Sequence, residues 1–400
     1  MAVLVRSEKA SAAERLRAPP VAIFLWSRLL IWASAVFVWI WFEPRPGLPP
    51  EAKDLGYATE VWYRADAAWF VSIAEHGYAG NGSAAFYPLY PLSVGLVGRA
   101  FGGLYVTAGV VVSLAACLGA FVLLHRLALP RLGADGARRT VLYLALFPMA
   151  LYLQAVYCES LYLLCCLGAF TLAERRRWLP AGSVTGLAML TRVAGVALLP
   201  ALAVMAWRSP ERQRALASLA VAPLIWALYP LWLQLELHAP RAEFAAQAAW
   251  GRHLSYAGPL AGLWHGLQAA WAGIEQVATG DATRYWPHAA AAADPLRTAS
   301  RNLEDFAFLA VFAWLGVLAW RRFGAPYGLF VLGSLAVPLS APTSGYPLLS
   351  MPRFCLPLFP AFMALAAITV SPRRERTVLA ASSLLLGAVI VEWVAGQWVS

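Results

Sequence analysis

Long apolar runs alternate with short polar segments along almost the whole chain. A helix needs about 20 apolar residues to cross about 30 Å of hydrocarbon. The runs that reach or approach this length fall near residues 21–42, 104–124, 140–156, 160–173, 179–190, 193–206, 215–237, 306–320, 325–340, 354–370 and 377–396. The pattern predicts an all-α polytopic membrane protein with about 9–11 transmembrane segments, forming one integral membrane domain over residues 1–400.

Composition supports this class of protein. Of the 400 residues, 60% are hydrophobic and 13% are charged, against about 25% charged residues in soluble domains. The net charge of +10 does not indicate a nucleic-acid partner, because basic residues in short loops between apolar runs mark the cytoplasmic face of a membrane protein. The five cysteines lie mostly inside apolar runs without metal-ligand spacing, so we expect them to be packing residues. We expect membrane lipids to surround the apolar helices.

The positive charges predict the topology. The first apolar run continues through Phe42, past the cleavage-like Ala33-Ser34-Ala35, which favours a retained span over a signal peptide. With a cytoplasmic N-terminus, 19 of the 31 Lys and Arg fall in short inner segments, 11 fall in longer outer segments and Arg28 lies within the first span. Residues 43–103 and 239–305 then form two large extracytoplasmic loops.

Two apolar blocks, 179–190 and 193–206, are each too short to span comfortably. They predict a hairpin of half-length helices that turns at Thr191-Arg192 on the outer side. Non-helical backbone at membrane depth is tolerated only inside protein or against water, so such a turn is typical of a functional site.

Several unusual charges converge on the outer face in this topology. A charge at the centre of a membrane helix costs about 2.5 to 3.5 kcal/mol on insertion scales, so ionisable residues at span ends indicate function. The residues concerned are Asp66, Glu75, Glu159, Arg192 and Arg353. This face is where we expect the active site.

Asp66 is the first candidate for chemistry. It lies beside aromatic residues just beyond the first span, where a membrane enzyme would hold a catalytic base. The segment 62–78 is also amphipathic, so an equal alternative is a membrane-surface anchor in which Asp66 caps the start of a helix. Glu75 and His76 follow in the same stretch as candidates to bind substrate or support Asp66.

Other motifs have two interpretations each. Phe86-Tyr87-Pro88-Leu89-Tyr90-Pro91 forms a rigid turn whose aromatic faces would bind a sugar or join an interfacial aromatic belt. Glu159 would orient a substrate hydroxyl or pair with Arg192. Arg192 and Arg353 have the guanidinium geometry for phosphate recognition, or they extend toward the membrane interface.

The order of these motifs resembles the PIG-V family, the GPI mannosyltransferase II type of GT-C glycosyltransferase, in its bacterial form. The resemblance covers most of the chain. It depends on five motifs together, which are Asp66 with Ile73-Ala74-Glu75-His76-Gly77-Tyr78, then Phe86–Pro91, Tyr157–Leu161, Leu190–Arg192 with Gly195, and Ser350–Phe354 before Leu356–Pro360. Family members usually carry Trp directly before the loop Asp, where this chain has Ala65.

The resemblance implies a GT-C type bundle whose first outer loop bears interfacial helices. It implies inverting transfer of mannose from polyprenyl-phosphate-mannose to a hydroxyl of a lipid, glycan or protein acceptor, at the extracytoplasmic face of a bacterial cytoplasmic membrane. Asp66 would be the general base, and Arg192 and Arg353 would bind the donor phosphate. Glu75, His76, Tyr87, Tyr90 and Glu159 would bind or support substrate, with no metal or other cofactor required.

Two alternative functions remain at this stage. The same aromatic residues and arginines would suit a transporter or flippase of a lipid-linked saccharide, although the two halves of the chain show no convincing internal repeat. A non-catalytic subunit of a glycosylation complex is the other alternative, which Ala65 keeps open.

Overall fold

In the computed structural model, residues 19–41, 54–80, 82–280, 295–343, 345–397 and 399 are described. These residues form helices and connecting segments without a β-strand. The helices are α2 (Pro19–Trp41), α3 (Tyr57–Glu60), α4 (Ala67–His76), η2 (Ser83–Ala85), α5 (Leu89–Ala100), α6 (Tyr105–Ala145), η3 (Ala150–Leu153), α7 (Glu159–Glu174), α8 (Trp178–Met189), η4 (Val193–Ala197), α9 (Leu198–Trp207), α10 (Arg212–Leu219), α11 (Val221–Leu237), α12 (Ala242–Ala249), α13 (Pro259–Thr279), α14 (Pro295–Phe323), α15 (Ala325–Leu339), α16 (Met351–Cys355), α17 (Phe359–Ile368) and α18 (Pro372–Val394). The predicted all-helical class is therefore confirmed.

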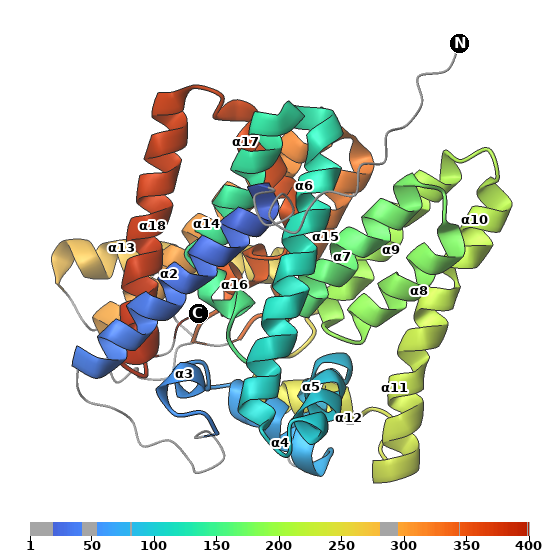
Figure 1. Cartoon of the computed structure of the whole chain (residues 1–400), viewed down its shortest axis with the longest axis horizontal. Coiled ribbons are helices and arrows are strands. Elements are labelled where there is room, and N and C mark those ends of the chain that lie inside the picture. Colours follow the sequence, from blue (N-terminus) through green and yellow to red (C-terminus); the bar gives the residue numbers. More distant parts are fainter. Residues whose placement is uncertain are drawn as a thin grey trace.

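Five of the described helical stretches are long and apolar enough to cross a membrane. They are Pro19–Trp41, Tyr105–Ala145, Arg212–Leu237, Leu296–Phe323 and Pro372–Val394. Other apolar helices are shorter, such as α8 with 12 residues and α9 with 10 residues. Figure 1 shows the long helices α6 and α18 running in nearly the same direction and α2 slanted between them, with the shorter α3, α4, α5 and α12 gathered at the lower end.

Local sequence explains several helix boundaries. Helix α18 starts after Ser371, whose hydroxyl accepts a hydrogen bond from the Arg374 N–H, and Pro372 occupies the first turn. Pro at this position loses no intrahelical hydrogen bond, because the first N–H groups of a helix have no partner. Inside α6, Gly133 has φ 70° and ψ −179°. This non-helical residue, three positions after Pro130, lets the chain turn at the upper end of the molecule (Figure 1).

The predicted apolar segment 140–156 is wrong as a span. The helix ends at Ala145, and the chain continues irregularly to Cys158 with a single 3-10 turn, although every residue from 141 to 160 is buried. Irregular backbone is stable at such depth only when protein groups satisfy its polar atoms. Arg28 from α2 does so here, donating to the Ala145 and Ala150 carbonyls at 2.7 Å each. The periodicity could not reveal this break.

The other apolar blocks are closer to expectation. The predicted half-length hairpin is present, since α8 ends at Met189 and η4 with α9 begins at Val193. The block 354–370 is divided into α16 and α17 around Pro357. The segment 239–305, expected to be an outer loop, contains α12, α13 and the start of α14, while its residues 281–294 and residues 43–53 of the first loop lie outside the described part.

Helix α13 has an exposed apolar face. Its exposed large side chains are Leu260, Leu263, Trp264, Leu267, Trp271, Ile274 and Val277. Their spacing of three or four residues places them along one side of the helix. The opposite side packs on α14 and α15, so the apolar face is suited to contact lipid.

Candidate active site

Asp66 directly precedes α4, and its carboxylate joins an ion pair. Although Asp66 occupies the N-cap position, its side chain makes no capping hydrogen bond. Instead, its Oδ2 accepts a hydrogen bond from Nη1 of Arg353 at 2.7 Å. The Asp66 side chain is 28% exposed. The capping alternative is therefore wrong, and this carboxylate remains accessible to a ligand.

The hydroxyl of Tyr157 fixes the backbone on both sides of Ala65. It donates to the Arg64 carbonyl at 3.0 Å and accepts from the Asp66 N–H at 3.1 Å. Ala65 between them has φ 47°, the left-handed conformation that costs a non-glycine residue about 1–2 kcal/mol. Because Ala65 is exposed, the absence of the usual aromatic side chain leaves no cavity in the core.

Glu159 links the two predicted arginines. It is the first residue of α7 and its side chain is fully buried. Its Oε1 accepts from Nη1 of Arg192 at 2.7 Å and also from Nε of Arg353. A buried carboxylate is stable only when paired and hydrogen-bonded. Of the two roles open to Glu159, pairing with Arg192 is the one that the contacts support.

Arg353 and Arg192 are held by aromatic rings as well as by acids. The guanidinium of Arg353 lies 4.6 Å from the Tyr157 ring centre and 5.2 Å from that of Tyr152. That of Arg192 lies 4.7 Å from the Phe354 ring centre. These are cation–π distances. Within the described part of the chain, Nη2 of each arginine makes no hydrogen bond to protein, so both retain a donor for an anion.

The other predicted residues make no ion pair or hydrogen bond to these four side chains within the part of the chain that the structure describes. Glu75 and His76 occupy the last turn of α4, about 14 Å along the helix from Asp66 at 1.5 Å per residue. Both are exposed, and they contact each other at 4.0 Å. The Tyr90 hydroxyl bonds to α6 through the Gly109 carbonyl at 3.1 Å and Ser113 Oγ at 2.9 Å. Tyr87 packs on Tyr229.

The structure adds residues that sequence reasoning missed. In the segment between α12 and α13, Arg252 lies with its guanidinium carbon 5.7 Å from the Phe354 ring centre. Trp250, two residues earlier, contacts Trp69 edge-on at 6.0 Å, and Trp69 stacks on Phe86 at 5.6 Å. The sequence offered only an Arg near a Trp in a segment without a recognisable motif, which is too common a pair to single out.

Comparison with known proteins supports the resemblance found in the motifs. Residues 53–208 match the Mannosyltransferase (PIG-V) family, and this segment includes Asp66, Glu159 and Arg192. Over this segment, which is about two fifths of the chain, the sequence is similar to that family. Among curated protein sequences, none matches this chain significantly.

Solved structures show that this chain has a GT-C type fold. ArnT from Cupriavidus metallidurans bound to undecaprenyl phosphate matches with a TM-score of 0.52 and 16% identity, over 96% of this chain and 70% of ArnT. The apo state of the same ArnT matches with a TM-score of 0.50 and 17% identity, over 93% of this chain and 63% of ArnT. Both therefore extend beyond the region that this chain matches.

Proposed function

We propose that this chain transfers mannose from a polyprenyl-phosphate-linked donor to a hydroxyl acceptor, with inversion at the anomeric carbon and Asp66 as general base. The observation that carries the proposal is the difference in exposure within one ion-pair cluster. Asp66 is 28% exposed, whereas Arg353, Arg192 and Glu159 are 13%, 11% and 0% exposed. Asp66 is thus the acid of this cluster that a substrate hydroxyl can reach.

The proposed step is a single displacement. The acceptor oxygen attacks the anomeric carbon, its proton passes to Asp66, and the bond from the anomeric carbon to the phosphate oxygen breaks. A positioned general base contributes about a hundred- to ten-thousand-fold in rate. The ion pair with Arg353 holds the Asp66 carboxylate in place for this transfer.

The leaving group sets the second demand on the site. Its phosphate gains one negative charge as the sugar departs, so fixed cations stabilise the transition state more than the ground state. The unbonded Nη2 groups of Arg192 and Arg353 would meet that charge, and the scheme requires no divalent metal. The ArnT of similar fold is bound to undecaprenyl phosphate, which supports a lipid-phosphate donor.

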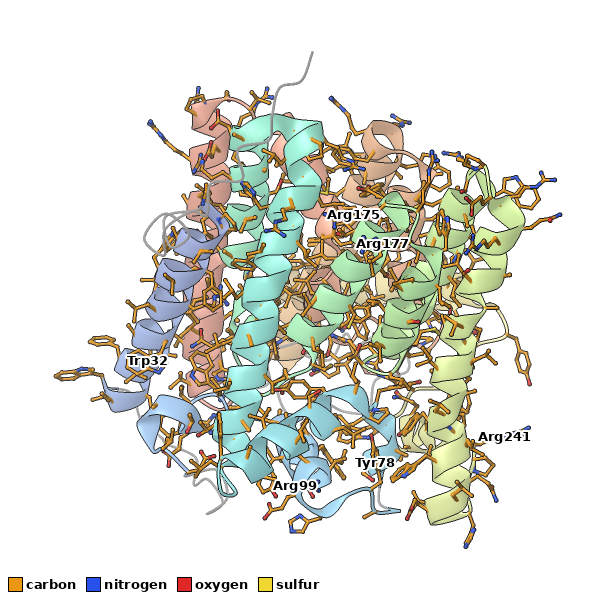
Figure 2. The ribbon with its side chains drawn as sticks, turned by 45° about the vertical axis from the view of Figure 1, so that its right-hand side comes forward. Trp32, Tyr78, Arg99, Arg175, Arg177 and Arg241 are labelled. Carbon is orange, nitrogen blue, oxygen red and sulfur yellow. The ribbon has the colours of Figure 1, made fainter. Side chains whose placement is uncertain are left out.

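We propose that the site faces outward from a bacterial cytoplasmic membrane and that the N-terminus is cytoplasmic. The arrangement of basic segments supports this orientation. Figure 2 shows Arg175 and Arg177 in the upper half of the molecule, and Arg99 and Arg241 near its lower end. The helices α4 and α5 that adjoin the site gather at this lower end (Figure 1).

The test is to incubate purified protein with radiolabelled polyprenyl-phosphate-mannose and a lipid extract of the host membrane, beside the Asp66→Asn variant. We expect label in a new product with the wild type alone, and the product will identify a lipid or a lipid-linked glycan as acceptor. Donor binding without transfer by the wild type would contradict the proposal and favour a transporter or a non-catalytic subunit.

A further inference from the structure

Arg252 lies in a different segment of the chain from the four charged residues of the ion-pair cluster. It follows α12, and its Nη2 donates to the Leu349 carbonyl at 3.3 Å, immediately before α16. Phe354 in α16 has the guanidinium of Arg192 near its ring at 4.7 Å and that of Arg252 near it at 5.7 Å. The sum of these distances, 10.4 Å, is an upper limit on the separation of the two guanidinium carbons.

Arg252 lacks the acidic partners that the other two arginines have. Asp66 is bonded to Arg353, and Glu159 to both Arg353 and Arg192. Among the residues that the structure describes, no carboxylate lies within ion-pair distance of Arg252, and the Leu349 carbonyl is the only hydrogen-bond acceptor of its side chain. One long bond satisfies little of a guanidinium with five N–H donors.

The electrostatic surroundings disfavour this cation in the absence of a ligand. Burial and, after it, the like charges of Arg192 and Arg353 lower the pKa of Arg252 to about 10, while Asp66 and Asp305 oppose the fall. Arg252 therefore stays charged at neutral pH but in a site that already holds two other cations. An anion that enters between them relieves the repulsion and restores hydrogen bonds at the same time.

We propose that Arg252 and Arg192, on the ring of Phe354, bind the phosphate group of the lipid-linked donor. The inference rests on the proposed function and names the residue that completes its donor site. A phosphate bridged by two guanidiniums needs them within several ångströms of one another, which the 10.4 Å limit permits. Arg192 supplies its unbonded Nη2, and Arg252 supplies donors that have no acidic partner.

The experiment compares Arg252→Gln and Arg252→Lys with a matched control, Arg241→Gln. Arg241 directly precedes α12 and is exposed near the lower end of the molecule (Figure 2), so its replacement removes the same charge from the same segment outside the site. Binding of a short-chain polyprenyl phosphate is measured by titration in detergent, with the uncharged polyprenol as a second probe. KM is measured separately for donor and acceptor.

We expect Arg252→Gln to weaken polyprenyl phosphate binding about 10- to 100-fold, as loss of a charge-assisted hydrogen bond implies. In this variant the donor KM should rise, while polyprenol binding and the acceptor KM should not change. Arg252→Lys should lose several-fold in affinity for polyprenyl phosphate. Wild-type affinity for polyprenyl phosphate in folded Arg252→Gln would overturn the inference and leave the proposed function intact.

The remaining outcomes are also decisive. A rise in the acceptor KM alone would assign Arg252 to a phosphate on the acceptor and overturn the inference. No binding of polyprenyl phosphate by the wild type would overturn the donor class itself, and with it the proposed function. Should Arg252→Gln fail to fold, the test uses Arg252→Lys, which keeps the charge but lacks the planar fork. A several-fold loss of affinity for polyprenyl phosphate would support the inference, and wild-type affinity would overturn it.

Discussion

Arg353 bonds to Asp66 across 287 residues of sequence, with Nη1 and Oδ2 2.7 Å apart. The same guanidinium binds Glu159 through Nε. Arg353 therefore connects the loop after the first span to the start of α7 and to α16, and the position of the catalytic candidate depends on all three. This dependence gives the following predictions.

Replacing Asp66 with Asn should reduce transfer about a hundred- to ten-thousand-fold while the protein stays folded, because the amide cannot accept the proton. Sugar transfer from polyprenyl-phosphate-mannose and the thermal midpoint in detergent measure the two effects. Asp135→Asn, at an exposed position within α6, is the matched control and should retain activity. Wild-type turnover in Asp66→Asn would exclude the base assignment.

Replacing Glu159 with Gln should destabilise the protein by about 3 kcal/mol or more, because it removes the shared acid from two largely buried arginines. The thermal midpoint of the purified protein should fall well below that of Glu236→Gln, which alters an exposed glutamate in α11. Equal midpoints for the two variants would show that Glu159 does not hold the arginines in place.

Replacing Tyr157 with Phe should lower turnover and stability together. The variant loses the hydroxyl that bonds to the Arg64 carbonyl and the Asp66 N–H, at a cost of about 1–3 kcal/mol. Tyr143→Phe loses a hydroxyl bond to Thr369 at a similar burial, so it should lose stability but retain turnover. A comparable loss of turnover in both variants would argue against a specific role for Tyr157 in positioning Asp66.

Replacing Arg28 with Met should destabilise the protein by about 2 kcal/mol, because two buried carbonyls lose charge-assisted hydrogen bonds. The thermal midpoint of Arg28→Lys should lie between those of the wild type and Arg28→Met, because the lysine ammonium lacks the planar fork with which the guanidinium reaches both carbonyls. Thermal midpoints give the order, with Arg126→Met at an exposed position of α6 as control. An unchanged midpoint in Arg28→Met would show that other groups hold the irregular segment.

The sequence determined the class of protein and most of its helices. A long apolar run indicates a helix that crosses the membrane. The runs predicted at 21–42 and 377–396 correspond closely to α2 and α18. Within 140–156 the same apolar composition fills a buried irregular segment. Apolar composition specifies burial but not backbone conformation, and the donor that makes this conformation stable, Arg28, is more than a hundred residues away.

The sequence also indicated which residues are candidates for the chemistry, because a charge at the end of an apolar span is costly without a function. Asp66, Glu159, Arg192 and Arg353 were found in this way, and the structure brings them together. Only the tertiary structure decided that Glu159 pairs both arginines, that Glu75 and His76 lie away from them, and that Arg252 joins them. Ion pairs and desolvation depend on distances of a few ångströms between segments far apart in sequence, which local residue patterns do not encode.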